Sequence, residues 1–303
     1  MPKFTLRQLE YFRAVALHGS ISAAAEAERV SRSSVSAALD DLESALGSPL
    51  CIRTKAQGIE LTANGRVILR SAEAILDGVE EMQQLGTGSE LSGTLTIGCF
   101  PSLAPTMIPL LWQEFARDHP LVKLDVVTAG RSELVQKLDR GEVDLVLAYN
   151  LHEFDGLAVA AIYDTCMHAI LAPDHPLAAG QSVHAADLAA APLLLMDVPP
   201  SAEDVMGYFT ALGLTPRIGL RSPQFEFIRS LVARGLGYSL FIQRPRTLTS
   251  YEGLPVAALP VVPAPPLERA GIAWSERRRL PRRSQAFIEL VKTHAGELAP
   301  RAM

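Results

Sequence analysis

The first sixty residues constrain the fold most, because the spacing of their apolar side chains defines three helices in close succession. In the first helix these side chains recur every third residue, at Leu6, Leu9, Phe12 and Val15, which predicts one buried stripe. Gly19 is suited to end this helix, and Ser20 and Ser31 are suited to cap the next two. The third helix carries its apolar side chains at Val35, Leu39, Leu42 and Leu46. Two short helices joined by a tight turn are typical of a helix-turn-helix.

The exposed face of the third helix is polar and begins with an arginine. Arginine reads guanine edges through two hydrogen bonds, and serine reaches either a base or a phosphate. Residues 50–61 then form two short apolar strands around a turn at Ala56-Gln57-Gly58, which predicts a β-wing along a phosphate backbone. The candidate DNA-binding residues are Ser20, Ser22, Ser31, Arg32, Ser33, Ser34, Ser36, Arg53 and Lys55.

The charge of the chain taken alone argues against a nucleic-acid partner. The formal net charge is −5, and the seven basic residues of positions 1–60 are balanced by seven acidic ones. Neutralising phosphates needs Lys and Arg. We therefore expect few phosphate contacts per protomer, and an affinity that depends on dimerisation and on base contacts.

A long helix without proline is predicted from Thr62 to about Leu85. About 24 residues at about 1.5 Å each make a helix of roughly 36 Å. Its apolar side chains alternate at spacings of four and three, at Ile68, Ala72, Ile75, Val79 and Met82, which is typical of a coiled-coil seam. The helix could pack on its own domain, but a Gly/Ser-rich segment at residues 86–93 follows it. The seam therefore favours a partner helix.

From Thr94 the pattern changes to alternating strands and helices, the signature of parallel α/β architecture. Strands are predicted at Leu95–Gly98, Lys123–Thr128, Asp144–Ala148, His168–Ala172, Leu193–Met196, Arg217–Leu220, Tyr238–Ile242 and Ala270–Trp274. Helices are predicted at Leu103–Asp118, Arg131–Arg140, Ala202–Leu212, Phe225–Arg234 and Ser284–Leu298.

Several of these runs together resemble the LysR-type transcriptional regulators. In the N-terminal part they are LRQLxYFxAV, GSxxxAA, the S-x-x-L-x-x-LE-x-x-LG-x-x-L run that ends at Leu50, Arg53 and LTxxG. In the C-terminal part they are LTIG with the LAPTMIPLL helix, FARDHP, LDRGEVDLVL, HPL and VARGLGYSL. The chain departs from the family at Arg32, where a glutamine is usual, and at Ala37, Ala38, Asp40 and Asp41, where basic or amide residues are common.

The resemblance implies a mixed α/β chain with three parts. These are a winged helix-turn-helix at residues 1–61, a linker helix for dimerisation at 62–91, and a two-lobed regulatory domain like periplasmic solute-binding proteins at 92–303. The first lobe is expected at about 92–163 and 267–303, and the second at about 164–266. The expected partners are double-stranded operator DNA, a small-molecule effector, and a second copy in a dimer or tetramer. RNA polymerase is a further partner that the resemblance allows.

Four strand-to-helix junctions should face the cleft between these lobes, where ligands of open α/β sheets bind. Helix N-termini favour an anion there, and a carboxylate is expected. The candidate effector-binding residues are Cys99, Phe100, Ser102, Thr128, Ser132, Asp197, Ser201, Ser222 and Phe225. Arg131 and Arg221 are the cations adjacent to the junctions. For each serine an ordinary helix cap is an equally good interpretation, and each aromatic ring could belong to the core.

Other functions are less well supported by the residues. Cys99 and Cys166 would suit a redox-responsive regulator, but no local cluster of Lys and Arg would lower a thiol pKa, so buried, inert thiols are favoured. The seven histidines show no HxxxH or HExxH spacing, and no GxSxG or Walker pattern occurs. No enzyme activity, metal or cofactor is therefore expected. The N-terminus lacks an apolar signal region, which argues against a solute-binding protein for transport and predicts a cytoplasmic protein away from the membrane.

Overall fold

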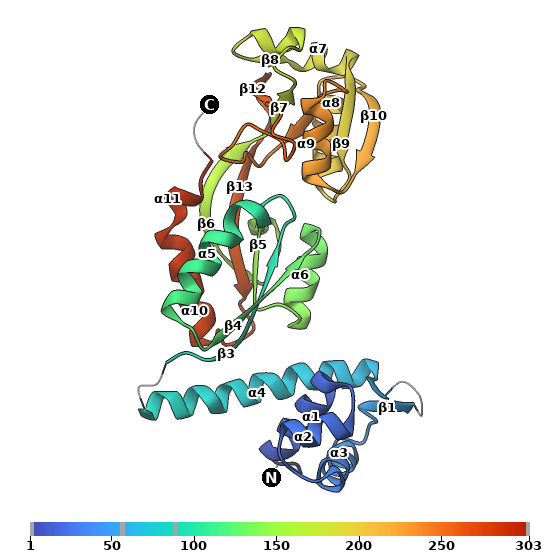
Figure 1. The fold of residues 1–303 in the computed structure, drawn as a ribbon, viewed down its shortest axis with the longest axis vertical. Helices are drawn as coiled ribbons and strands as arrows, with labels where there is room; N and C mark the ends of the chain where they lie inside the picture. Colours follow the sequence, from blue (N-terminus) through green and yellow to red (C-terminus); the bar gives the residue numbers. More distant parts are fainter. Residues whose placement is uncertain (1–2, 55–57, 88–89, 301–303) are drawn as a thin grey trace. The chain divides into compact units, whose positions relative to one another are not determined.

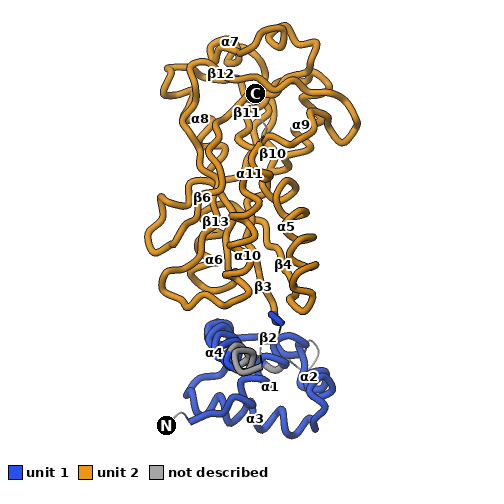
Figure 2. Tube along the Cα trace, turned by 90° about the vertical axis from the view of Figure 1, so that its left-hand side faces the viewer, with its two compact units in different colours: residues 1–93 blue, residues 94–303 orange. Residues whose placement is uncertain are grey.

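The computed structural model describes residues 3–54, 58–87 and 90–300. The chain divides into two compact units, residues 1–93 and residues 94–303 (Figure 2). The first unit is mainly helical, and the second is a mixed α/β unit with two lobes (Figure 1). Among the helices that are described, none is long and apolar enough to cross a membrane.

The described residues of the N-terminal unit form four helices and a two-stranded hairpin. The elements are α1 (Leu6–His18), α2 (Ile21–Ala27), α3 (Arg32–Leu46), β1 (Cys51–Thr54), β2 (Gly58–Leu61) and α4 (Ala63–Thr87). The predicted caps are confirmed, because the hydroxyl of Ser20 accepts from the Ala23 N–H and that of Ser31 from the Ser34 N–H, each at 3.1 Å. Gly19 and Gly47 end α1 and α3 in the left-handed region.

The core of this unit is formed where α1, α2 and α3 meet the first half of α4. Leu9, Phe12 and Val15 of α1 are buried. Leu6 was predicted in the same stripe, but its side chain is 43% exposed. The reason is geometric: a spacing of three falls short of the 3.6 residues of a helical turn, so a stripe of four such residues drifts around the helix.

The first lobe of the second unit is a five-stranded sheet with helices packed on it. Its strand order is β4-β3-β5-β13-β6, and β3 and β5 run parallel, whereas β13 is antiparallel to both its neighbours. The elements are β3 (Gly93–Cys99), α5 (Ala104–Asp118), β4 (Val122–Thr128), α6 (Arg131–Arg140), β5 (Leu145–Tyr149), η1 (Leu151–Glu153), β6 (Leu157–Cys166), β13 (Leu267–Ser275), α10 (Arg282–Thr293) and α11 (Ala295–Leu298).

The second lobe contains a four-stranded sheet, β11-β7-β12-β8, and a parallel pair, β9 and β10. The elements are β7 (His168–Leu171), η2 (Pro176–Ala179), β8 (Val183–His184), α7 (Ala185–Ala190), β9 (Pro192–Met196), α8 (Ser201–Ala211), β10 (Arg217–Ser222), α9 (Phe225–Ala233), β11 (Ser239–Phe241) and β12 (Ala257–Val262). Backbone hydrogen bonds of Tyr238 to Pro192 and Leu194 join the β9 pair to the start of β11.

Two long neighbouring strands connect the lobes (Figure 1). β6 and β13 pair from Leu157 opposite Ser275 to Cys166 opposite Leu267. The sequence did not predict β6, which is rich in alanine, or β12, which contains Pro260, a residue that cannot donate to a ladder. It also missed the short β8 and α7. The helix predicted at Ser284–Leu298 is divided into α10 and α11 at His294.

Candidate functional site

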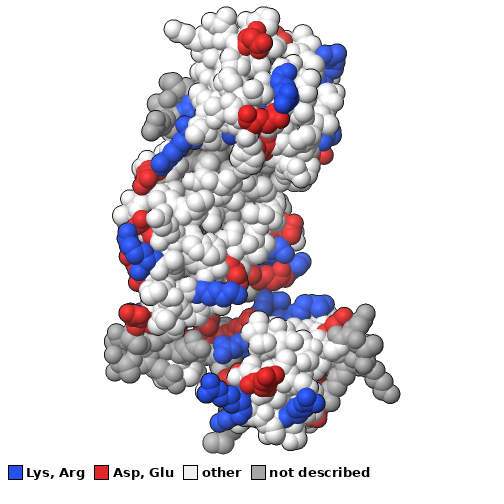
Figure 3. Space-filling view, viewed as in Figure 1, with Lys and Arg blue, Asp and Glu red and all other residues white. Residues whose placement is uncertain are grey.

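The first turn of α3 presents a polar, exposed surface. Arg32, Ser33 and Ser34 are all exposed, whereas Ser36 is half-buried. The hydroxyl of Ser31 lies 2.8 Å from those of Ser33 and Ser34 as well as capping the helix. On α2, Ser22 is exposed, and the hydroxyl of Ser20 is occupied by its cap. Basic and acidic side chains are mixed on the visible face of this unit (Figure 3). The surface therefore offers one arginine and several hydroxyls at a helix N-terminus.

The predicted wing is present as a strand pair, with Arg53 on β1 opposite Ile59 on β2. The N–H of Ile59 donates to the carbonyl of Gly19 at 2.7 Å, which holds β2 against the end of α1. Lys55 and the turn residues before Gly58 lie outside the described residues.

Two residues that orient this wing were not recognised as such from the sequence. One carboxylate oxygen of Glu43, on α3, accepts from the N–H groups of Leu50 and Cys51 at 2.6 and 3.0 Å. At Gly65, in the first turn of α4, an added Cβ would lie 2.0 Å from the carbonyl oxygen of Leu50. Both belong to the LE and LTxxG runs. The signal was therefore in the sequence, but its physical reason is a backbone approach that only the fold reveals.

The apolar seam predicted on α4 is divided between two environments. Ala72 is 1% exposed and lies in the core of its own unit, and Ile68 packs against that core. A residue so buried has no surface to offer a partner helix. The prediction that Ala72 lies in a dimer seam therefore does not agree with the structure. Ile75 and Met82 are 43% and 71% exposed, and Val79 is half-buried.

The four predicted strand-to-helix junctions are present in the second unit. Two belong to the first lobe, between β3 and α5 and between β4 and α6, and two to the second, between β9 and α8 and between β10 and α9. The lobes touch there: a Cβ added to Gly130 would lie 2.8 Å from the carbonyl oxygen of Pro199. The junctions therefore meet across a closed cleft.

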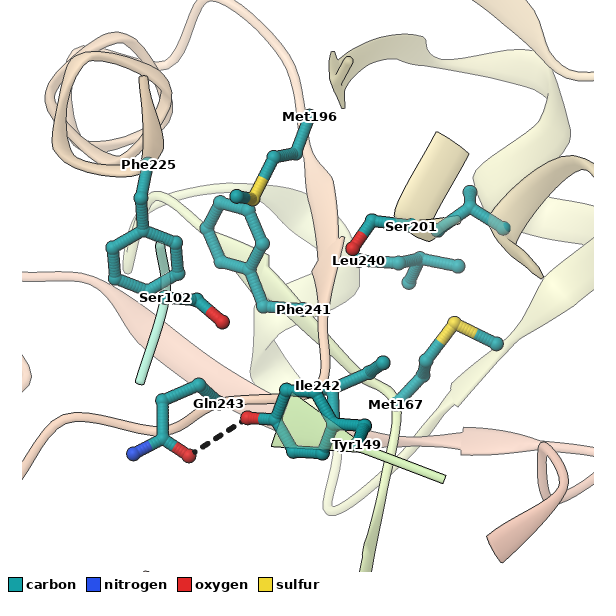
Figure 4. Close-up of a pocket in the computed structure, with 11 residues that line it drawn as sticks. Ser102, Tyr149, Met167, Met196, Ser201, Phe225, Leu240, Phe241, Ile242 and Gln243 are labelled. Carbon is teal, nitrogen blue, oxygen red and sulfur yellow. Dashed lines mark hydrogen bonds between the residues drawn. The ribbon is translucent and has the colours of Figure 1, made fainter. Parts of the chain in front are cut away.

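One end of this cleft, here called the apolar pocket, is lined mainly by hydrophobic side chains (Figure 4). Its lining consists of Ser102, Tyr149, Met167, Met196, Ser201, Val205, Phe225, Leu240, Phe241, Ile242 and Gln243. The hydroxyls of Ser102 and Ser201 enter it from opposite lobes. Its free volume is about 10 Å³, which is about what one water molecule needs.

Gln243 closes the apolar pocket and connects the two lobes. This residue follows β11 of the second lobe and is 2% exposed. Its carbonyl oxygen accepts from the hydroxyls of Tyr149 and Tyr163 at 3.1 and 2.7 Å, and its amide nitrogen donates to the Thr106 hydroxyl at 2.6 Å. All three partners belong to the first lobe, so this one side chain holds both lobes together.

The other end of the cleft, here called the charged pocket, also has a free volume of about 10 Å³. It is lined by Phe100, Arg131, Tyr149, Pro200, Ser201, Asp204, Ile242 and Glu268. Tyr149, Ser201 and Ile242 line both pockets, so the two are adjacent parts of one site. Burial and, to a smaller extent, the charge of Asp204 raise the pKa of Glu268 from 4.5 to about 7. Burial also raises the pKa of Asp204, against the opposing effect of Arg131.

The predicted effector-binding residues are therefore divided. Phe100, Ser102, Ser201 and Phe225 line the two pockets. The remaining candidates are placed outside the lining of both: Thr128, Ser132 and Asp197 are exposed, and Cys99 and Ser222 are buried. Asp197 forms an exposed ion pair with Arg221 at 3.3 Å, and Ser222 accepts from the Gln224 N–H. Tyr149, Asp204, Gln243 and Glu268 were missed because they come from different elements and carry no common motif.

The cysteines offer little support for redox chemistry. Cys99 is fully buried, and burial raises the pKa of its thiol, which disfavours the reactive thiolate. Cys51 and Cys166 are half-buried. Within the described ranges, no three His, Cys, Asp or Glu side chains are grouped so as to hold a metal ion.

Comparison with known families gives two matches that together span most of the chain. Residues 6–66 match the family described as "Bacterial regulatory helix-turn-helix protein, lysR family". The family of the LysR substrate binding domain matches residues 88–296.

Individual relatives agree with these matches. The SDS degradation transcriptional activation protein of Pseudomonas sp. (strain ATCC 19151) is 32% identical over 240 residues, 75% of this chain and 76% of the relative. The DNA-binding transcriptional dual regulator OxyR of Escherichia coli (strain K12) is 28% identical over 238 residues, 78% of each chain. The crystal structure of HinK, a LysR family transcriptional regulator from Pseudomonas aeruginosa, is similar with a TM-score of 0.63 and 30% identity, covering 98% of this chain and 100% of HinK.

Proposed function

The chain belongs to the LysR family of DNA-binding, ligand-responsive transcription regulators, and from this premise we propose how its own residues perform the two tasks. The first turn of α3, with Arg32, reads operator DNA, and the exposed apolar side chains of α4 join two copies in a dimer or in each half of a tetramer. A small molecule with a carboxylate binds between the lobes and changes the affinity for DNA. The protein acts in the cytoplasm, where RNA polymerase is the partner it regulates.

Support for the DNA contact comes from exposure and chemistry. Arg32 is exposed beside the Ser33 and Ser34 hydroxyls, and an arginine at such a position makes base contacts that serine cannot replace. Support for the dimer comes from Ile75 and Met82, two large apolar side chains that their own unit leaves exposed.

The single observation that supports the effector site best is the meeting of Ser102 and Ser201 in one pocket. Ser102 lies just before α5 of the first lobe, and Ser201 begins α8 of the second. A carboxylate between them would accept from both hydroxyls and lie near the positive end of α8. Since the free volume of the pocket is about that of one water, the lobes must separate before a ligand enters.

A thermal-shift screen of small carboxylates on the full-length protein tests this proposal. A ligand of the native state raises the melting temperature with concentration, and the same compound should change the affinity for DNA sequences selected from a random pool. Ser201→Ala should remove the shift. Ser132→Ala is the matched control, because this serine is also near a helix start but is exposed outside both pockets. Equal shifts in both variants would contradict the proposed site.

A further inference from the structure

The charged pocket contains a guanidinium whose hydrogen-bonding capacity is only partly used. The side chain of Arg131 is 14% exposed, and one terminal nitrogen lies 3.1 Å from a carboxylate oxygen of Glu153. The other terminal nitrogen donates to the Tyr149 carbonyl at 3.4 Å. Its Nε is buried and has no hydrogen-bond partner among the residues that the structure describes. A buried donor without a partner is unfavourable because it has lost its hydrogen bonds to water, so this nitrogen would gain from a ligand that supplies an acceptor.

The same pocket has more carboxylates than cations. Asp204 and Glu268 line it with Arg131, and Glu153 is already paired with that arginine. Glu268 is 6% exposed and accepts from the Asn150 amide at 2.6 Å through one oxygen. For Asp204 the described residues provide no side-chain hydrogen bond. The raised pKa values of these two acids have burial as their largest cause and show that their charges are poorly compensated.

We infer that the effector is a zwitterion with an apolar side chain, of which an α-amino acid is the simplest example; this inference rests on the proposed function. Its carboxylate accepts from Nε of Arg131, and its ammonium group donates to Asp204 and Glu268. Its side chain occupies the apolar pocket, which is reached past the shared residues Tyr149, Ser201 and Ile242. A phosphate or a dicarboxylate would place two negative charges beside three carboxylates, whereas the zwitterion provides the missing cation.

Matched compounds that differ by one charged group test this inference on the full-length protein. The probes are phenylalanine, 3-phenylpropanoate, which lacks the amine, and phenethylamine, which lacks the carboxylate. Leucine, 4-methylpentanoate and 3-methylbutylamine form a second set. Isothermal titration calorimetry should show binding of at least one amino acid, with each of its single-charge analogues at least tenfold weaker.

The outcomes separate this inference from the proposed function. If 3-phenylpropanoate binds as tightly as phenylalanine, the zwitterion is wrong and the carboxylate effector stands. If only the amines bind, both are wrong. If none of the six compounds binds, the apolar zwitterion is wrong, and the carboxylate screen decides the proposed function separately.

Variants identify the groups responsible. Asp204→Asn should weaken the amino acid at least tenfold and leave the amine-free carboxylate unchanged, which removes the preference between the two. Glu203→Gln is the matched control, because Glu203 is exposed one residue away on α8, and it should retain the preference. If Asp204→Asn retains the preference while its melting temperature matches that of the control, the ammonium site is overturned.

Discussion

Replacing Glu268 with glutamine should make the protein more stable at pH 8 but not at pH 4.5. The acid is buried beside Asp204, and its pKa is raised from 4.5 to about 7. In the unfolded chain it ionises near its ordinary pKa, so between these two values the folded state holds a proton that the unfolded state has lost. The free energy of unfolding therefore contains a favourable contribution from protonated Glu268, which is complete below pH 4.5 and is lost as the pH rises through 7.

The magnitude follows from the change in pKa. At about 1.4 kcal/mol for each pH unit, a rise from 4.5 to about 7 corresponds to at most about 3 kcal/mol. Glutamine resembles the protonated acid in shape and retains an oxygen for the Asn150 amide, but it never carries the charge. The variant should therefore equal the native protein at pH 4.5 and exceed it by up to about 3 kcal/mol at pH 8, which is several degrees in melting temperature for a unit of this size.

Melting temperatures of the native protein and the variant, measured by scanning calorimetry at half-unit steps from pH 4.5 to 8, check this expectation. Glu276→Gln is the control, because Glu276 directly follows β13 but is exposed. The same stability difference at every pH would refute the reasoning, because a constant difference reflects packing and not ionisation.

Three further substitutions test the N-terminal unit. Arg32→Ala should weaken binding to a selected operator by about 1–3 kcal/mol and leave binding to random duplex nearly unchanged in fluorescence anisotropy; equal losses would make it a phosphate contact. Ile75→Asp should give a monomer in light scattering and abolish operator binding, because a charge would be buried between partner helices, and an intact dimer would contradict this. Gly65→Ala should destabilise the N-terminal unit by about 1–3 kcal/mol, since its Cβ would lie 2.0 Å from the Leu50 carbonyl oxygen. Urea unfolding followed by circular dichroism measures this loss, and an unchanged unfolding midpoint would show that the backbone moves apart at no cost in stability.

Features set by neighbouring residues were predictable from the sequence. Ser20, Ser31, Gly19 and Gly47 cap the predicted helices because capping depends on local backbone geometry. For the same reason the four strand-to-helix junctions were placed correctly. The coiled-coil seam was less reliable, because spacing alone cannot show whether Ala72 meets a partner or its own core.

The composition of the cleft could not be predicted in the same way. The sequence placed Arg131 next to a strand-to-helix junction. Its neighbours in the charged pocket, Asp204 and Glu268, lie 73 and 137 positions further along the chain, on α8 and β13. Gln243 reaches three first-lobe residues from a segment that has no motif. The sequence therefore predicted an anion at the strand-to-helix junctions, and this stays a prediction. The acids that favour an additional cation depend on strand order and on the crossing between lobes, which the sequence does not show.

The ionisation of Glu268 also provides a direct test of what occupies the charged pocket. An ammonium group placed beside this carboxylate favours its charged form, so binding lowers its pKa and releases its proton. Asp204 and Arg131 line the same pocket, and Glu153 is paired with Arg131. Burial raises the pKa of Glu268 to about 7, so this acid is largely protonated at pH 6.5 in the empty site. Binding of phenylalanine at pH 6.5 should therefore release up to about one proton, and much less at pH 8.5, where Glu268 is already ionised. Calorimetry at each pH in two buffers of different ionisation enthalpy measures this number. A binding heat that is independent of buffer at pH 6.5 would show that no ammonium group approaches Glu268, even if the amino acid binds elsewhere in the cleft.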